Sequence, residues 1–196
     1  MRICKVCGGK YLAKGLCNKH WKQMSRHGKI FKRTIYDRNE IILKKDYAEI
    51  VLYNVKCEEI GRAKINLEDV DKCRKYKWGL NNHGYVITTI ERKAFFLHHL
   101  ILTRKDGYEV DHRDVNPLNN RRGNLRYATH QENSFNKKKA RGYCFDKRDK
   151  KWIAYIIINN KQINLGYFDT EDGARTARKK AEIKYFGKFR YKGKKK

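Results

Sequence analysis

The sequence of 196 residues lacks any long hydrophobic run. No apolar stretch approaches the roughly 18 residues of a membrane-spanning helix, and the first residues lack the hydrophobic region of a signal peptide. Internal repeats and heptad patterns are also absent, so the sequence offers no obvious dimer interface. We therefore expect a soluble, intracellular, cytoplasmic protein with no membrane partner, for which a monomer is the favoured state.

Acidic residues are scarce, with 21 Asp and Glu against 48 Lys and Arg, and the formal net charge is +27 at pH 7. This excess is too large for an ordinary enzyme of small neutral metabolites, so we expect no small-molecule substrate. A polyanion fits better, because each phosphate that a basic side chain neutralises releases counterions and adds affinity. Acidic membranes are the competing polyanion, but the basic residues are spread along the chain among aromatic ones and do not gather on one amphipathic helix. The charge therefore predicts a nucleic-acid partner.

The six cysteines are unevenly distributed. Without a secretory signal, a disulfide framework is not expected. Three of them join a histidine in the pattern Cys4-x2-Cys7-x9-Cys17-x2-His20. Two short turns of this kind surround a metal with three thiolates and one imidazole, which is the arrangement of structural Zn²⁺. The pattern predicts a zinc knuckle over residues 1–31 whose folding depends on the metal, the alternative being three reduced cysteines near a surface histidine.

Residues 47–100 alternate short apolar segments with turn residues, which predicts a small α+β unit anchored by Trp78. A short helix is expected near residues 69–76. Thr129 and Glu132 match a capping box, so another helix is expected to begin at Thr129. The predicted strands are residues 49–53, 61–65, 85–89, 94–97 and 108–112.

Residues 142–186 predict a second small unit of three strands and one helix. Asn159 and Asn160 form a two-residue hairpin turn between the last two strands. On the helix, Ala174, Ala177 and Ala181 share one stripe, and such small residues allow it to lie close on a sheet. The predicted strands are residues 142–146, 151–158 and 161–168, and the helix covers residues 170–186.

Residues 110–133 read VDHRDVNPLNNRRGNLRYATHQEN. A DH pair, an NN-x3-NLR stretch and a T-x2-EN helix start follow one another here. Over roughly residues 95–137 the sequence resembles the HNH nuclease motif of the ββα-metal, or His-Me finger, superfamily, in the variant of phage and intron-encoded homing enzymes. The resemblance implies hydrolysis of a phosphodiester with one divalent metal ion.

The same resemblance implies a role for each matching residue. His112 is the general base, Asp111 and Asn133 are ligands of the divalent ion, and Asn124 holds the loop and orients the histidine. The chemistry agrees, because a neutral imidazole accepts a proton at physiological pH, and carboxylate and amide oxygens suit Mg²⁺ or Mn²⁺. The expected phosphate clamps are Arg121, Arg122 and Arg126.

The sequence departs from the plain His-Asn-His pattern because Asn133 stands where the last histidine would be. His130 lies one turn earlier on the same helix face, so it is the alternative ligand. The family often has a His-Arg pair where this chain has His98 and His99, which implies a supporting role for His98, the alternative being a structural histidine. Adjacent strand residues point to opposite faces, so Asp111 and its neighbour converge only where the strand twists or ends.

The C-terminal unit contains KWIAYI and LGYF and resembles the Apetala/ethylene-response-factor DNA-binding domain. That resemblance implies a three-stranded antiparallel sheet that lies in the major groove and is backed by one helix. The arginines with which the plant domains read bases are missing here, so the target sequence does not carry over, and specificity rests on apolar and amide contacts. The alternative is a unit for protein contacts. The expected DNA-binding residues are Lys147, Arg148, Lys150, Lys151, Tyr155, Lys161, Gln162 and Asn164.

Together these patterns predict an α+β, multi-module, site-specific endonuclease for double-stranded DNA, of phage or mobile-element homing type, in the host cytoplasm if a phage encodes it. One motif per chain predicts one active site and a nick in one strand. The alternative is a DNA-binding regulator whose nuclease core is inactive. The expected modules are a zinc knuckle at 1–31, the HNH domain at 32–137, a basic linker at 138–141, the sheet domain at 142–189 and a basic tail at 190–196.

Overall fold

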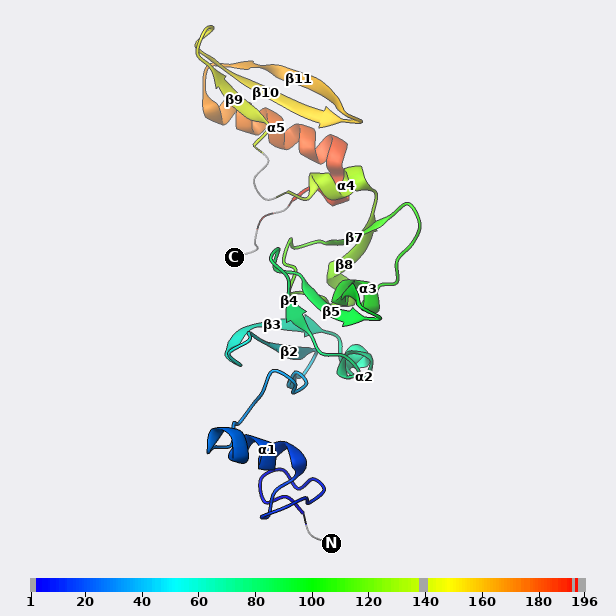
Figure 1. Cartoon of the computed structure of the whole chain (residues 1–196). Coiled ribbons are helices and arrows are strands. Elements are labelled where there is room, and N and C mark those ends of the chain that lie inside the picture. Colours follow the sequence, from blue (N-terminus) through cyan, green and yellow to red (C-terminus); the bar gives the residue numbers. More distant parts are fainter. Residues whose placement is uncertain (1–2, 138–140, 192, 194–196) are drawn as a thin grey trace. The chain divides into compact units, whose positions relative to one another are not determined.

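The computed structural model describes residues 3–137, 141–191 and 193 (Figure 1). Most of the linker expected at 138–141 and of the tail expected at 190–196 falls outside the described residues. No helix in the described ranges is both long enough and apolar enough to cross a membrane. The chain divides into two compact units, Met1–Asp37 with Tyr53–Glu59 and Arg38–Leu52 with Ile60–Lys196.

The N-terminal unit consists mainly of two tight turns and one helix. Antiparallel bridges close the turns. The helix α1 (Asn18–His27) begins directly after Cys17 and ends just before Gly28. Gly28 adopts a left-handed conformation, with φ of 64°, and its N–H donates a hydrogen bond to the carbonyl oxygen of Met24. Glycine adopts such a conformation more readily than residues with a Cβ atom, so it is a good helix stop. The sequence predicted the ligand pattern in this region but not the helix.

The core of the second unit lies around two three-stranded antiparallel sheets, β1-β2-β3 and β4-β5-β6. Trp78 is 2% exposed, and its Nε1 donates a hydrogen bond of 2.9 Å to the carbonyl oxygen of Cys73, which confirms its role as an anchor. The strands expected before residue 100 are confirmed within two residues at each end, but the last one passes directly into a helix that was not predicted. The elements are β1 (Ile41–Leu43), β2 (Ala48–Tyr53), β3 (Glu59–Ile65), η1 (Leu67–Asp69), α2 (Val70–Arg74), β4 (Gly79–Leu80), β5 (Val86–Ile90), β6 (Lys93–Phe96) and α3 (Leu97–Ile101).

A strand–loop–strand–helix segment follows this core. The predicted strand is confirmed as β7 (Glu109–His112), and it pairs antiparallel with β8 (Leu125–Ala128), which was not predicted. The one-turn element η2 (Arg122–Asn124) precedes β8. The helix α4 (His130–Phe135) begins after Thr129 with the expected capping box. Local side-chain chemistry therefore fixes the start of this helix.

The C-terminal segment forms the predicted antiparallel sheet of β9 (Tyr143–Asp146), β10 (Lys151–Ile158) and β11 (Lys161–Phe168), with β10 in the centre. Asn159 and Asn160 both have positive φ, 50° and 60°, as a tight hairpin turn requires. The helix α5 (Glu171–Phe186) lies along one face of the sheet (Figure 1). Ala174 and Ala181 are buried, and the turn η3 (Gly187–Phe189) follows the helix.

Candidate active site

β7, the loop after it and α4 surround an open pocket of about 530 Å³. Asp111 and His112 both line it, although neighbouring residues of a regular strand point to opposite faces. They converge because β7 ends at His112. The other polar residues of the lining include Tyr85, His130, Asn133, Ser134, Asn136 and Lys137.

The imidazole of His112 is buried and held by an amide. Its Nε2 lies 3.2 Å from Oδ1 of Asn120, whose Nδ2 donates a hydrogen bond of 3.0 Å to the carbonyl oxygen of Pro117. That second bond fixes the amide so that its oxygen faces the imidazole, and Nε2 therefore carries the proton and leaves Nδ1 as the basic nitrogen. Burial lowers the pKa of His112 below 6.5, although the hydrogen bond that the imidazole donates to Asn120 and the nearby carboxylates offset part of this shift. The ring is therefore neutral at physiological pH.

Asp111 is buried with 6% exposure and is held from two sides. Nε of Arg126 lies 2.7 Å from its Oδ2, in a cross-strand pair between β7 and β8. Nδ2 of Asn136 donates to Oδ1 at 3.0 Å, to Oδ2 at 3.2 Å and to the carbonyl oxygen of His112 at 2.8 Å. The carboxylate is therefore paired with Arg126 and fixed in orientation.

Asn133 and His130, the two alternative ligands, share one partner. Nδ1 of His130 lies 2.8 Å from Oε1 of Glu109, and Nδ2 of Asn133 donates to Oε2 of the same carboxylate. These hydrogen bonds lower the pKa of Glu109. Because its amino group is held by Glu109, Asn133 has its Oδ1 left as the group that can bind a cation.

Asn124 holds the loop between β7 and β8. Its Nδ2 donates hydrogen bonds of 2.8 Å to Oδ1 of Asp114 and to the carbonyl oxygen of Asn119, and its backbone oxygen accepts from the N–H of Arg113. The sequence predicted that Asn124 holds the loop and orients the histidine. In the structure the amide at hydrogen-bond distance from the imidazole is that of Asn120, at 3.2 Å.

The oxygens at this pocket fit a hard divalent cation. In the described part of the chain, Oδ1 of Asn136 is buried and has no hydrogen-bond partner. It belongs to the same side chain that contacts both carboxylate oxygens of Asp111. A buried carbonyl oxygen without a donor is costly unless a cation or water satisfies it, and carboxylate and amide oxygens are the ligands that Mg²⁺ and Mn²⁺ prefer.

In a comparison with known proteins, residues 95–135 match the family model described as HNH endonuclease. This match supports a nuclease function for that segment of the chain. The chain is also 36% identical over 117 residues to an uncharacterized HNH endonuclease of Acanthamoeba polyphaga mimivirus. That similarity covers 54% of this chain, and the chain spans 58% of the length of the relative. No solved structure matches the sequence.

His98 lies beside the general base predicted in the HNH domain. Its ring centroid is 5.2 Å from that of His112, and Tyr85 lies within 6.0 Å of both rings. Burial, together with neighbouring cationic groups, lowers the pKa of His98 to about 3. His98 is therefore neutral at physiological pH, and its contact with His112 is a ring contact.

The three arginines expected to clamp phosphates occupy different environments. Arg121 is exposed, with its guanidinium 5.7 Å from the ring centroid of Tyr47. Arg122 is paired with Asp69 at 2.7 Å, and the hydrogen bond to this carboxylate raises its pKa. Arg126 is buried against Asp111, so contact between its guanidinium and a phosphate would require local movement.

The expected DNA-binding residues of the C-terminal segment lie on or beside the sheet face away from α5. Ala154 and Ile156 are fully buried on the other face of β10, so Tyr155 and Ile157 face outward. The strand register pairs Tyr155 with Asn164 and Ile157 with Gln162. Asp149 and Asp169 form ion pairs with two of the predicted cations. The other predicted cations, Lys147, Lys150 and Lys161, are exposed on this segment.

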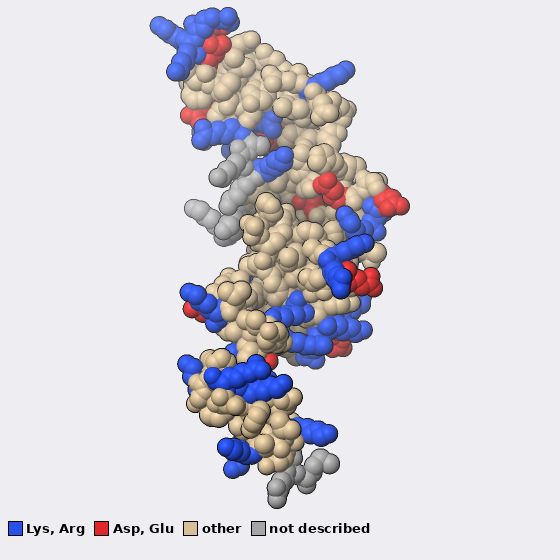
Figure 2. Space-filling model, in the orientation of Figure 1, with Lys and Arg blue, Asp and Glu red and all other residues tan. Residues whose placement is uncertain are grey.

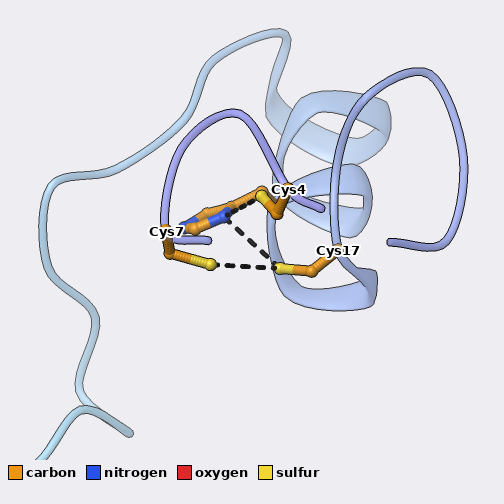
Figure 3. Close-up of side chains that lie close together, drawn as sticks. Cys4, Cys7 and Cys17 are labelled. Carbon is orange, nitrogen blue, oxygen red and sulfur yellow. Dashed lines mark hydrogen bonds between the residues drawn. The ribbon is translucent and has the colours of Figure 1, made fainter. Parts of the chain in front are cut away.

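The N-terminal unit brings its predicted ligands together (Figure 3). Ligand atoms of Cys4, Cys7, Cys17 and His20 all lie within 4.8 Å of one another, with Cys7 Sγ to Cys17 Sγ at 3.8 Å. Nδ1 of His20 lies 3.3 Å from Sγ of Cys4 and 3.4 Å from Sγ of Cys17. A tetrahedral zinc ion separates two sulfurs by about 3.8 Å and a sulfur from a nitrogen by about 3.5 Å. The four groups are therefore a candidate metal site of the right size.

The Cys4 sulfur is already suited to bind a metal. Burial opposes ionisation, but hydrogen bonds from His20 and from backbone N–H groups outweigh it and lower the pKa of Cys4 to about 5. The thiolate is the form that coordinates zinc. Cys17 is the N-cap of α1 and His20 follows one turn later, so the start of this helix sets two of the four ligands.

Among the residues that contact the predicted active-site groups, sequence reasoning missed Glu109, Asn120 and Asn136. Glu109 had a usable signal, because it lies two positions before Asp111 and hence on the same strand face. Asn136 lies one helical turn after Asn133. Asn120 belongs to the NN-x3-NLR stretch, but its contact with the imidazole depends on the path of an irregular loop, which the sequence does not give.

Proposed function

We propose that this protein is a metal-dependent, site-specific DNA endonuclease of homing type that nicks one strand. The observation that carries the proposal is the buried, neutral His112, whose Nε2 is fixed by Asn120 beside the carboxylate of Asp111. A binding-only protein has no need for a base next to oxygen ligands. The HNH match and the net charge of +27 support a nucleic-acid substrate. Figure 2 shows Lys and Arg side chains scattered over the visible face.

In this proposal, Nδ1 of His112 takes a proton from the attacking water. The water oxygen bonds to phosphorus, the bond from phosphorus to the 3′ oxygen breaks, and the 3′ oxygen leaves with a proton from solvent. Proton removal by a positioned base contributes about 10²–10⁴-fold to the rate. The products are a 3′-hydroxyl and a 5′-phosphate.

Asp111 and Asn133 would hold the divalent ion, and Glu109 fixes the amide of Asn133. When bound, such an ion supplies positive charge that stabilises the scissile phosphate and the leaving oxygen. His130 binds the other oxygen of Glu109 and supports the same arrangement. Cys4, Cys7, Cys17 and His20 would hold a structural Zn²⁺ ion, and the outer face of β9–β11 would lie against duplex DNA.

The test is incubation of supercoiled plasmid carrying candidate sites with the purified protein and Mg²⁺, with EDTA and a protein-free reaction as controls. Metal-dependent cleavage supports the proposal. Tight DNA binding without cleavage supports the second candidate, an inactive DNA-binding regulator. One observation favours that candidate: Arg126 and Asn136 already occupy the carboxylate of Asp111.

A further inference from the structure

The turn after α5 is linked to Asp111, the candidate metal ligand, by hydrogen bonds of the Arg126 guanidinium. On one side, Nε and Nη2 of Arg126 each lie 2.7 Å from Oδ2 of Asp111. On the other side, its Nη1 donates a hydrogen bond of 2.6 Å to the carbonyl oxygen of Lys188, and Nη2 lies 3.5 Å from that of Phe189. The same guanidinium therefore links residues that are 78 positions apart in the sequence.

The ring of Phe189 supports this link from one face. The guanidinium carbon of Arg126 lies 4.4 Å from the ring centroid, and Phe189 is 8% exposed. A cation over an aromatic face is attracted by the ring, more strongly when both are removed from water. Phe186 stacks on Phe135 of α4 with ring centroids 3.9 Å apart, so the turn is anchored next to the nuclease helix.

The contact with Arg126 leaves one carboxylate oxygen of Asp111 with fewer hydrogen bonds than the other. Both nitrogens of Arg126 bind Oδ2, whereas Oδ1 accepts only the hydrogen bond of 3.0 Å from Asn136 among the contacts that the structure describes. A carboxylate offers about four acceptor positions, so Oδ1 keeps room for a cation. Because the carbonyl oxygens of the turn hold the planar guanidinium of Arg126, this group prevents the carboxylate of Asp111 from rotating.

We propose that Phe189 and Arg126 are positioning residues: the turn after α5 holds the guanidinium, and the guanidinium holds Asp111 with Oδ1 available to the divalent ion. This inference rests on the proposed function, because it takes Asp111 as a metal ligand. It assigns the C-terminal segment a role in assembling the active site in addition to any contact with DNA. In the opposite interpretation, Arg126 blocks the site by pairing with Asp111. Metal binding would then become tighter when the contact between the turn and Arg126 is weakened.

The test measures Mn²⁺ affinity of the zinc-loaded full chain by electron paramagnetic resonance, together with plasmid cleavage. The Mn²⁺ binding that is lost in the Asp111→Asn variant is assigned to this site. Phe189→Leu keeps an apolar side chain but removes the ring, so we expect Mn²⁺ binding to weaken about 10–100-fold, the usual cost of losing a group that orients a ligand. Arg126→Lys keeps the charge but loses the fork and should weaken binding similarly. Phe189→Tyr keeps the ring and should bind Mn²⁺ with wild-type affinity.

Tyr185→Ala is the matched control, because it removes an exposed aromatic ring from the end of α5, just before the turn, without touching Arg126. Thermal unfolding and zinc content of every variant report whether the fold is kept. Wild-type Mn²⁺ affinity, or tighter binding, in both Phe189→Leu and Arg126→Lys would overturn the inference while leaving a cleaving enzyme intact. A wild-type chain that neither cleaves DNA nor binds Mn²⁺ at Asp111 would overturn the proposed function and this inference with it.

Discussion

A single imidazole carries the proton transfer in the proposed reaction, and its surroundings set the pH at which it works. Replacing it in His112→Ala should lower the cleavage rate by about 10²–10⁴-fold, the usual contribution of a general base. DNA affinity should stay nearly unchanged, because a buried neutral ring contributes little to phosphate binding. Single-turnover cleavage and a filter-binding titration measure the two quantities separately. Wild-type cleavage by this variant would mean that the base is another residue.

The same residue predicts a pH profile. The base works only when unprotonated, so activity is present above its pKa and is lost as pH falls through it. Because burial lowers the pKa of His112, the acidic limb of the cleavage rate should have its midpoint below pH 6.5. Rates at saturating DNA from pH 5 to 8 locate the midpoint, and a midpoint above 7 would contradict the assignment.

His98 predicts a loss of stability in acid. Its pKa is about 3 in the folded chain and about 6.5 when unfolded, so the unfolded state binds the proton more tightly. The free energy of unfolding should therefore fall as pH drops below 6.5, by up to about 1.4 kcal/mol per pH unit from this group. His98→Phe should reduce that slope. Urea unfolding at pH 7.5 and 5.5 gives the comparison, and an unchanged slope would show that other groups dominate.

At the scale of elements, the N-terminal turns and α1 depend on four ligands from a short piece of chain. Cys4→Ser or Cys17→Ser should release one zinc ion per chain and unfold this unit, because so short a piece has no sufficient core of its own. Cys144→Ser is the control, since Cys144 is exposed on the C-terminal sheet. Metal analysis and circular dichroism provide the measurements. Purified wild-type protein without zinc would show that the assignment is wrong.

The C-terminal sheet offers two adjacent residues with different expected roles. Gln162 faces outward opposite Ile157, and an amide beside an apolar side chain suits an adenine edge and a thymine methyl group. Gln162→Ala should therefore weaken binding to the preferred site by about 1–3 kcal/mol and leave the salt dependence unchanged. Lys161→Ala should weaken binding to all sequences and lower the salt slope by about 1. Equal effects of the two changes on specific and random duplexes would contradict base reading by this face.

Comparison of the predicted with the observed elements shows which sequence patterns were sufficient to predict secondary structure. The capping box of α4, the Asn159-Asn160 turn and the strands β10 and β11 were predictable because each depends on neighbouring residues. β8 was not predicted, since its pairing with β7 spans an irregular loop. The metal-ligand spacing of the N-terminal unit is also local. Contacts such as Arg126 with Phe189 depend on how distant elements pack, and no local pattern encodes them.

At the scale of the whole molecule, the proposed function has one active site per chain, at the HNH match over residues 95–135. Two strands of opposite polarity need two such sites or a reorientation. Nicked plasmid circles should therefore accumulate before linear DNA, with ends that ligase seals without prior phosphorylation. A time course on supercoiled plasmid with strand-specific end labels tests this. Linear product that forms directly, with a rate rising as the square of enzyme concentration, would show a dimer making a double-strand break.

In the proposed function, the stack of Phe135 on Phe186 would limit exchange of the C-terminal segment for one that binds another DNA target. A recombination junction near residue 141 would separate the nuclease motif from the C-terminal sequence. The backbone carbonyls that hold Arg126 lie beyond that junction, at residues 188 and 189. A chimera should therefore lose activity unless the incoming helix ends in an equivalent aromatic turn. Selection for cleavage would then keep the last helical turn even while the outer sheet face diverges.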